Sequence, residues 1–536
     1  MSLSTVIPQD FLKAVATEYF VSDNELEVLS MALRGEPIVA IAKKLDLTPE
    51  AVRKRLGEVY KKFRITGAGP GKLAKLMSLL DSLHQKSLKR DNLVSAESAV
   101  VYTERSRSRP RLDWGEAPDV SVFYGRTEEL NMLKRWCVDD KCRIVALLGM
   151  TGIGKTALSV KLAEEIGEQF DYVIWRSLRR APSIENLLDD LIQSLPDERA
   201  IYQTYNNDAR IERLLDCLKK HRCLIVLDNL ESLLCSENIA GQFEEKHQDY
   251  GKLLERLGER HQSCIVITSL EKTKEIAFAE GETLPVRSYQ VKGLDPVYAE
   301  KFLQEKQLVD RQQYDYLIRH YRGNPLALKI ASTTIKELFG GKISEFLAQK
   351  VTLVQDIRDL IKQQYERLSE REKEIAGWLA IVGNPLPWQD IKLNSLLFVS
   401  DDELFEALES LQRRNMIERN AAGFTFPPVV MEYVRNQLSD GITREIYQAI
   451  KLSKIQQIKM LKAYCLDIQE ERDETVESLI PNITDKIIET LRKVYREDSV
   501  LQEKLSQLCS KIEEKPIEEI GYAADNIDYL IEQLSD

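Results

Sequence analysis

The stretch that decides the fold of this chain reads "ALLGMTGIGKTALSVKLA" and covers residues 146–163. Its glycines and the pair Lys155–Thr156 match the GxxxxGK(S/T) pattern of a phosphate-binding loop. The apolar run 144–148 precedes the loop and a helical pattern at 157–166 follows it. This strand–loop–helix context is what the motif requires, and a chance match in a chain of this length arises in about a few per cent of cases. The stretch therefore predicts a nucleotide site.

The parts of this loop have separate predicted roles. Backbone N–H groups of residues 152–156 would surround the phosphates at the start of a helix, where the helix dipole favours anions. The ammonium group of Lys155 would neutralise β- and γ-phosphate oxygens, and the hydroxyl of Thr156 would bind Mg²⁺. The residues predicted to contact the nucleotide here are Gly149, Thr151, Gly152, Ile153, Gly154, Lys155, Thr156 and Ala157.

A second strand pattern, "LIVLDNLE" at residues 224–231, would deliver Asp228 to the C-terminal edge of the same sheet. Without a phosphate loop, an ordinary strand followed by an Asp-Asn turn would be the better interpretation. Beside a phosphate loop, a carboxylate in this place is expected to bind Mg²⁺ through water. We therefore predict Lys155 and Asp228 as the catalytic candidates and Thr156 and Asp228 as the Mg²⁺ residues. The expected cofactor is ADP or ATP with Mg²⁺.

The composition is typical of a soluble globular protein, with 43% hydrophobic and 30% charged residues in a chain of 536. No apolar run approaches the roughly 18 residues of a membrane span, and the N-terminus lacks the pattern of a secretory signal. Eight well-separated cysteines without a C-x-x-C pair, and five dispersed histidines, argue against a disulfide framework or a zinc site. We expect a cytoplasmic protein with reduced thiols and no membrane partner.

The pattern along the chain predicts several domains. Residues 1–81 are helical and basic, with 15 Lys/Arg against 10 Asp/Glu in residues 1–90, and a tight "LDLTPE" turn predicts a helix-turn-helix. Residues 82–121 are polar and contain prolines, which is typical of a linker. Strand and helix patterns alternate up to residue 290 and predict a parallel sheet wrapped by helices. Helical patterns then fill residues 291–355, residues 356–440 with one hairpin-like piece, and residues 441–536.

The order of the motifs resembles the NB-ARC ATPases, a STAND class of signal-transduction ATPases that includes plant resistance and apoptosome proteins. The motifs are "VFYGRTEEL" (122–130), the phosphate loop, "FDYVIWRSL" (170–178), "CLIVLDNLE" (223–231), "CIVITS" (264–269) and "RGNPLALK" (322–329). The resemblance covers about residues 122–437 and is strongest to bacterial, cyanobacterial-type members. An ordered set of motifs is far more specific than a phosphate loop alone.

The resemblance implies a fold class and further site residues. The fold class is multidomain α/β plus α. The P-loop sheet occupies residues 122–290, a helical domain residues 291–355, and a winged-helix domain that closes over bound ADP residues 356–440. A LuxR-like helix-turn-helix precedes them at the N-terminus, and a helical region follows at 441–536. Phe123, Tyr124, Gly125 and Arg126 would lie along the adenine. Pro325, with Leu326 of the same "GNPLAL" motif, would pack on the base.

Three departures from the family pattern predict weak or absent hydrolysis. Leu270 stands where the family usually has an arginine that senses the γ-phosphate, and Asn229 stands where an aspartate commonly positions water. Pro427 lies where a histidine would reach the β-phosphate. Loss of one charge donor to the transition state costs about 10³-fold in phosphoryl transfer. Glu231 and Lys272 are the alternatives that would restore this function.

Three functions remain open at this point. The first is a nucleotide-gated switch that oligomerises or releases a partner, the second a DNA-binding regulator, and the third a turnover ATPase. Arg53, Lys54 and Arg55 would face a DNA groove in the second function, and would be solvated charges on a protein-binding or self-associating adaptor in the first. The closing segment 520–536 resembles the part of longer relatives that leads into sensor repeats, so truncation before such repeats stays open.

Overall fold

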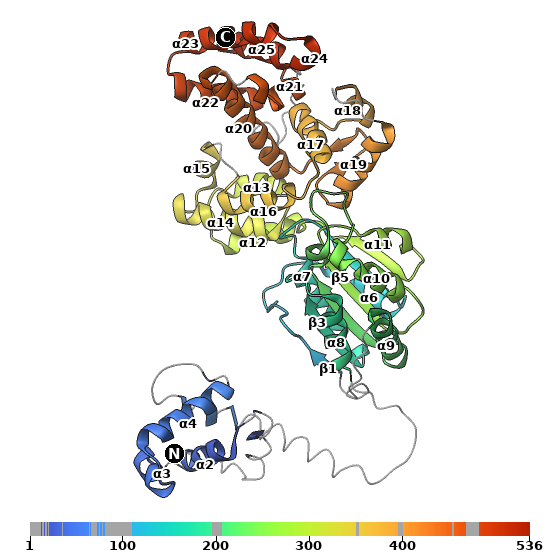
Figure 1. The fold of residues 1–536 in the computed structure, drawn as a ribbon, viewed down its shortest axis with the longest axis vertical. Helices are drawn as coiled ribbons and strands as arrows, with labels where there is room; N and C mark the ends of the chain where they lie inside the picture. Colours follow the sequence, from blue (N-terminus) through green and yellow to red (C-terminus); the bar gives the residue numbers. More distant parts are fainter. Residues whose placement is uncertain are drawn as a thin grey trace. The chain divides into compact units, whose positions relative to one another are not determined.

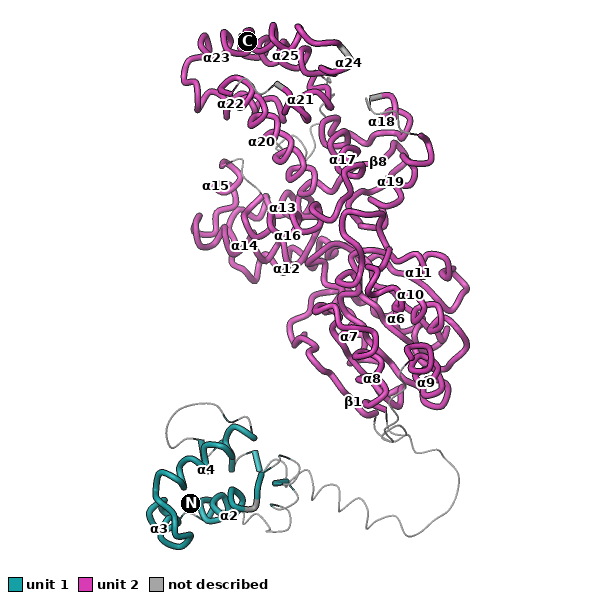
Figure 2. The backbone as a smooth tube through the Cα atoms, in the orientation of Figure 1, with its two compact units in different colours: residues 1–107 teal, residues 108–536 magenta. Residues whose placement is uncertain are grey.

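A computed structural model describes most of residues 12–80 and residues 110–195, 206–349, 353–394, 400–452, 455–467 and 482–535. The chain divides into two compact units, residues 1–107 and residues 108–536 (Figure 2). Most of the predicted linker, residues 82–109, lies outside the described residues. Each unit is described by itself.

The first unit contains three described helices, α2 (Asp23–Leu33), α3 (Ile38–Lys44) and α4 (Pro49–Lys62). Ser22 and Glu25 form the capping box that starts α2, and the hydroxyl of Thr48 accepts a hydrogen bond from the N–H of Ala51 at the start of α4. The three helices pack around small clusters of buried aliphatic side chains and Phe63.

The basic residues of α4 differ in exposure. Arg53 and Lys54 are exposed, whereas Arg55 is half-buried. Lys62 forms an ion pair with Glu25 of α2 and is half-buried as well. Of Arg53, Lys54 and Arg55, the first two are therefore the exposed ones, and Lys62 packs back onto the preceding helix.

The second unit contains a 6-stranded parallel sheet in the order β1–β3–β4–β5–β2–β6 within its described residues (Figure 1). The strands are β1 (Arg111–Asp113), β2 (Ile144–Leu148), β3 (Tyr172–Ser177), β4 (Cys223–Asp228), β5 (Cys264–Ser269) and β6 (Val286–Gln290). Every residue of β2, β4 and β5 is buried. Such continuous burial occurs when helices cover both faces of a parallel sheet.

Alternate residues of each strand supply two separate cores. Ile144 and Ala146 face a core shared with α8 (Ile184–Gln193), α9 (Asn207–Lys220), α10 (Asp249–Leu257) and α11 (Lys274–Ala279). Val145 and Leu147 face the core shared with α6 (Thr127–Val138) and α7 (Lys155–Ile166). The prediction of a P-loop-type parallel sheet wrapped by helices is confirmed.

The sequence pattern places residues 110–121 in the linker, but residues 111–113 form the edge strand β1, which pairs with β3. Arg176 of β3 donates to the carboxylate of Asp113, with 2.7 Å between Nη2 and Oδ2, and so ties the edge strand to the sheet. A strand this short has no periodicity that a sequence reading detects, and its pairing depends on β3 being in place.

Helices fill the rest of the second unit. The helices of the segment 291–355 are α12 (Pro296–Glu305), α13 (Tyr314–His320), α14 (Pro325–Leu338) and α15 (Ile343–Ala348). The next segment contains α16 (Gln355–Tyr365), α17 (Glu370–Val382), α18 (Trp388–Asn394), α19 (Asp401–Arg413) and a small antiparallel pair, β7 (Glu418–Arg419) and β8 (Phe424–Thr425). The pair lies where the sequence predicts a hairpin-like piece.

The C-terminal helices are α20 (Pro428–Leu452), α21 (Met460–Ala463), α22 (Ile483–Tyr495), α23 (Asp498–Glu513), α24 (Ile517–Ile520) and α25 (Ala523–Ser535). The predicted domain boundary after residue 440 falls inside α20. Gly441 lies within this helix and against Met460, where an added Cβ would collide with the sulfur. In the part of the chain that the structure describes, no helix has the length and apolarity needed to cross a bilayer.

Candidate nucleotide site

The predicted phosphate loop joins β2 to α7 at the C-terminal edge of the sheet. Gly149, Gly152 and Gly154 all have positive φ angles, and α7 begins at Lys155 directly after the last of them. At Gly152 an added Cβ would lie 2.6 Å from Cβ of Leu326, so only glycine allows the loop to meet α14 here. The first N–H groups of α7 therefore point out of the helix at a turn that is open to a phosphate.

Lys155 is buried in this loop, with 8% of its surface exposed. Its Nζ donates to the carbonyl oxygens of Gly149 and Met150, at 2.7 and 3.1 Å. Burial lowers the pKa of Lys155 to about 8, although the nearby Glu231 and Asp228 carboxylates oppose this shift. A bound phosphate would place negative charge beside Nζ and raise this pKa again.

Asp228 ends β4 beside the loop, as the sequence predicts. Its Oδ1 accepts hydrogen bonds from the hydroxyls of Thr156, at 2.8 Å, and Thr268, at 2.6 Å. Burial raises the pKa of Asp228, and these two donors and Lys155 oppose the shift. A hydroxyl and a carboxylate oxygen side by side are the hard donors that Mg²⁺ prefers, so Thr156 and Asp228 fit a Mg²⁺ ion that would neutralise phosphate charge.

Glu231 lies in the short helical turn after β4, and burial raises the pKa of its carboxyl. Its Oε2 accepts a hydrogen bond of 3.2 Å from the N–H of Leu270, at the end of β5. Asn229, between Asp228 and this turn, adopts a left-handed conformation and donates its N–H to Thr268. Glu231 is therefore close enough to Lys155 to affect its charge, and it joins the loops after β4 and β5.

Lys272 does not lie in a position to replace a missing arginine. Its Nζ forms an ion pair with Glu280, at 2.6 Å. That ion pair holds the ammonium group at the end of α11, so it is already engaged and does not take the place of the arginine that senses the γ-phosphate. Of the two alternatives from the sequence, Glu231 is the one whose charge acts on Lys155.

The predicted adenine-binding segment contacts the loop from another side. Arg126 is buried, adopts a positive φ, and donates from Nη2 to the carbonyl oxygen of Ile153 at 2.9 Å. Gly125 lies against the ring of Tyr298 in α12, and the hydroxyl of Tyr124 bonds to Glu305 of the same helix. Phe123 packs on the core between the sheet, α6 and α7.

The "GNPLAL" motif meets the loop at the start of α14. Asn324 caps this helix and donates from Nδ2 to the carbonyl oxygen of Thr151, at 2.9 Å. Leu326 donates its N–H to the carbonyl oxygen of Gly152, at 3.3 Å. Pro325 occupies the first turn of α14, and Ala157 lies half-buried in the first turn of α7. The structure thus brings the separate predicted segments to one loop.

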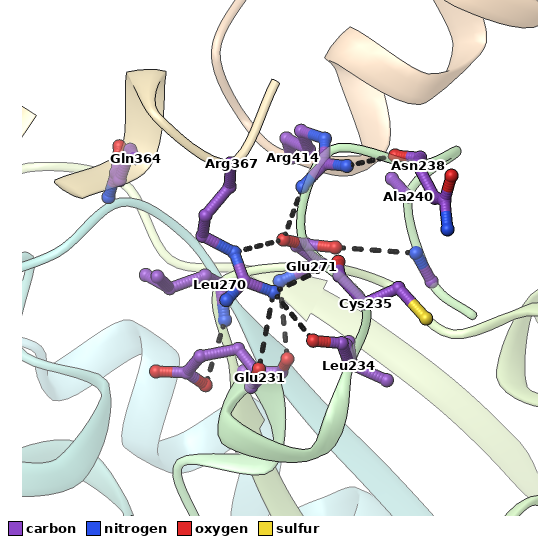
Figure 3. A network of polar contacts seen from close by, with 12 residues as sticks. Glu231, Leu234, Cys235, Asn238, Ala240, Leu270, Glu271, Gln364, Arg367 and Arg414 are labelled. Atoms are coloured by element: carbon purple, nitrogen blue, oxygen red, sulfur yellow. Dashed lines mark hydrogen bonds and ion pairs between the residues drawn. The ribbon is translucent and has the colours of Figure 1, made fainter. Parts of the chain in front are cut away.

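Sequence reasoning missed a buried cluster of charges that joins the sheet to residues 356–440 (Figure 3). We call it the Glu271 cluster, and it consists of Glu271, Arg367, Glu372, Ser410 and Arg414. Glu271 follows β5, and its Oε1 pairs with Arg414, at 2.7 Å, and with Arg367, at 2.9 Å. Arg414 also pairs with Glu372, at 2.9 Å, and Glu372 accepts a hydrogen bond from Ser410.

The Glu271 cluster lies next to the nucleotide loops. Arg367 also donates to the carbonyl oxygen of Glu231, and Leu270 accepts a hydrogen bond from Asn415, at 2.6 Å. In the sequence these residues are ordinary surface-type charges with no spacing that marks them. The only available signal is Glu271, two residues after the β5 pattern, which alone predicts nothing.

A phosphate loop between a strand and a helix, with a threonine, a lysine and a carboxylate at the carboxyl edge of a parallel sheet, defines a P-loop nucleotide-binding domain. Residues 126–249 match the family model described as the NB-ARC domain. The chain therefore carries an NB-ARC nucleotide-binding domain, of the fold that binds nucleotide together with Mg²⁺.

Relatives of known sequence extend this comparison. An uncharacterised WD repeat-containing protein of Nostoc sp. is 38% identical over 462 residues, which cover 79% of this chain and 37% of that protein. Disease resistance protein RGA5 of Oryza sativa is 29% identical over 26% of this chain and 13% of its own length. Disease resistance protein RRS1B of Arabidopsis thaliana is 26% identical over 56% of this chain and 21% of its own. The chain spans 37% or less of the length of these relatives.

Solved structures with a similar chain path include a Walker-type ATPase of Pyrococcus abyssi. It is 15% identical with a TM-score of 0.41, over 61% of this chain and 98% of its own. A STAND protein with a tetratricopeptide repeat sensor from Pyrococcus horikoshii is 18% identical with a TM-score of 0.30, over 79% of this chain and 60% of its own.

Proposed function

We propose that this protein is a nucleotide-gated signalling switch of the NLR-like STAND type. It holds ADP or ATP with Mg²⁺ between the P-loop domain and residues 356–440, which act as a winged-helix domain. Opening of this closed arrangement would allow self-association or release of a signalling partner. The observation that carries the proposal is the Glu271 cluster, because it ties residues 356–440 to the loop beside the nucleotide site.

The cluster suits a two-state contact. Two carboxylates and two guanidinium groups are paired here; Glu271, Glu372 and Arg414 are 2%, 1% and 3% exposed, and the side chain of Arg367 is 21% exposed. Paired in this way the charges are satisfied, but a partial separation leaves a buried charge without its partner, which costs about 3–5 kcal/mol. Full separation returns all of them to water. Such an interface favours a fully closed or a fully open arrangement of residues 356–440 against the P-loop domain over intermediate ones.

The nucleotide site and the closing surface share a loop. Glu231 lies close to Lys155 and bonds to Leu270, and the neighbouring Glu271 holds Arg367 and Arg414. A change in the charge bound at Lys155 would therefore alter the loop that anchors residues 356–440. This arrangement supports gating by nucleotide. It gives no support to rapid turnover, because Leu270 offers no charge to a γ-phosphate and Arg367 is engaged by Glu271 and by backbone carbonyls.

The experiment that tests this proposal measures the nucleotide that purified protein carries. Heat-denatured wild-type protein should release close to one ADP or ATP per chain in anion-exchange analysis. Lys155→Ala should release much less, because the phosphates lose their main charge partner. The control Lys161→Ala removes a lysine from the same helix that pairs with Glu164, and should retain the nucleotide. Wild-type protein that releases no nucleotide overturns the switch.

A second candidate function is DNA binding by the first unit, which would act as a LuxR-like helix-turn-helix. It is favoured by the exposure of Arg53 and Lys54 in the first turns of α4, after the short connection 45–48 from α3. The same surface suits an adaptor that binds a signalling protein or a second copy of the chain. The two are separated by the DNA-binding experiment described in the Discussion.

A further inference from the structure

Gln364 lies near the end of α16, on the side of the helix that meets the phosphate loop. Its side chain is 5% exposed, and its Nε2 donates to the hydroxyl of Thr151 at 2.6 Å. The carbonyl oxygen of the same threonine accepts from Asn324. The loop is therefore held at one residue by two amides, one from the segment 291–355 and one from α16.

The carbonyl end of the Gln364 carboxamide makes no hydrogen bond in this arrangement. Its Oε1 is buried and has no hydrogen-bond partner among the described residues. The cleft around it has apolar side chains such as those of Ile357 and Ile361, and also the polar side chains of Thr151, Tyr321, Arg322 and Asn324, but Oε1 bonds to none of them. A buried polar atom without a partner is unusual in a folded protein, and at the edge of a ligand site it points to a group that the ligand supplies.

The chemistry of the two partners permits a simple exchange. A threonine hydroxyl both donates and accepts, so either end of the carboxamide can bond to Thr151. If Oε1 accepts from Thr151, the Nε2 group becomes free to donate. Phosphate oxygens are acceptors only, and the phosphate loop is the element that would hold them.

We propose that Gln364 is a nucleotide-binding residue that α16 contributes to the site. Its carboxamide, held beside the loop by Thr151, donates from Nε2 to the terminal phosphate of bound ADP. This inference rests on the proposed function and deepens it, because residues 356–440 then contact the nucleotide directly as well as through the Glu271 cluster. Figure 3 shows Gln364 in α16 and Arg367 just after that helix, so one short segment serves both contacts.

The test compares ADP and AMP binding to the nucleotide-stripped full chain by isothermal titration calorimetry. Gln364→Glu keeps the shape but places a carboxylate beside the phosphate, and should weaken ADP binding by at least about tenfold. The matched control Gln363→Glu adds the same charge at an exposed position of α16 and should change ADP affinity less than about twofold. The loss in Gln364→Glu should be several-fold larger for ADP than for AMP.

Gln364→Leu is a second variant in case Gln364→Glu fails to fold, because leucine is similar in size to glutamine and would lie beside Ile357 and Ile361 of the same cleft. Without nucleotide it should melt within a few degrees of the wild type, and its stabilisation by ADP should be smaller. Equal losses for ADP and AMP would assign the contact to the nucleoside and overturn the proposal. Unchanged ADP binding in both Gln364 variants would overturn it while leaving the switch intact. A wild-type chain that binds no ADP overturns the switch and this role together.

Discussion

Glu271 and Arg414 form an ion pair of 2.7 Å between side chains that are each 2% exposed, and it joins the loop after β5 to the end of α19. The two residues are separated by 143 positions in the chain. Arg414 is also paired with Glu372, so both carboxylates of the Glu271 cluster are stabilised by this one guanidinium group. Loss of this one guanidinium would leave two buried carboxylates underpaired.

The first prediction concerns this pair. Arg414→Met should lower the free energy of unfolding by about 3 kcal/mol or more, because Glu271 and Glu372 lose a buried partner. Glu271→Gln combined with Arg414→Met should cost less than the sum of the two single changes. Urea unfolding measures each value. As a control, Arg319→Met removes an exposed pair with Asp315 and should cost no more than about 0.5 kcal/mol. Strictly additive losses in the double variant would contradict the coupling.

The second prediction concerns hydrolysis. Leu270→Arg with Asn229→Asp should raise the single-turnover rate by at least about tenfold, because a charge and a water-positioning carboxylate act mainly on the transition state. Nucleotide affinity should change little. The control Leu270→Met changes the side chain without adding charge and should leave the rate unaltered. A wild-type rate already near about 1 s⁻¹ would mean that another residue performs this task, and that the protein is a turnover ATPase.

The third prediction concerns proton uptake on nucleotide binding. Burial lowers the pKa of Lys155 from 10.5 to about 8 in the folded protein, so above pH 8 the lysine is increasingly neutral before nucleotide binds. Phosphate charge favours the protonated form and raises that pKa again. Binding at pH 9 should therefore take up close to about one proton, binding at pH 7 should take up almost none through Lys155, and affinity should fall as pH rises above 8.

Titration calorimetry at each pH, in two buffers of different ionisation enthalpy, measures this uptake. Lys161→Ala removes a lysine of α7 outside the loop and should show the same uptake as the wild type. Uptake that is equally small at pH 7 and pH 9 would contradict the lowered pKa.

The same pKa shift also affects folding stability. Between pH 8 and pH 10.5 the unfolded chain holds more protons at Lys155 than the nucleotide-free folded chain does. The contribution of Lys155 to the free energy of unfolding therefore rises with pH across that window.

The fourth prediction concerns the first unit. If α4 enters a DNA groove, Arg53→Ala and Lys54→Ala should each weaken binding by several-fold, and affinity should fall steeply with salt. Lys61→Ala removes the same charge from the far end of α4, where it pairs with Glu58, and should have a smaller effect. Gel-shift assays at low salt, with and without ATP, make the comparison. No binding at low salt would leave the adaptor function as the one to pursue.

The sequence by itself determined the nucleotide-binding fold. Continuous apolar runs at β2, β4 and β5 predict strands covered on both faces, and the glycine-rich stretch predicts the loop and the start of α7. These features depend on residues that are neighbours in the chain, so backbone geometry and local periodicity are enough to specify them.

Only the tertiary structure decided which distant side chains meet. Glu271 with Arg414, and Gln364 with Thr151, come from elements far apart in sequence, and nothing in their local patterns marks them. The lowered pKa of Lys155 likewise depends on burial that the complete fold creates. Packing decides which charged and amide side chains pair with one another. In the unfolded chain each of them forms hydrogen bonds with water, and a specific protein partner is needed only where the fold excludes that water.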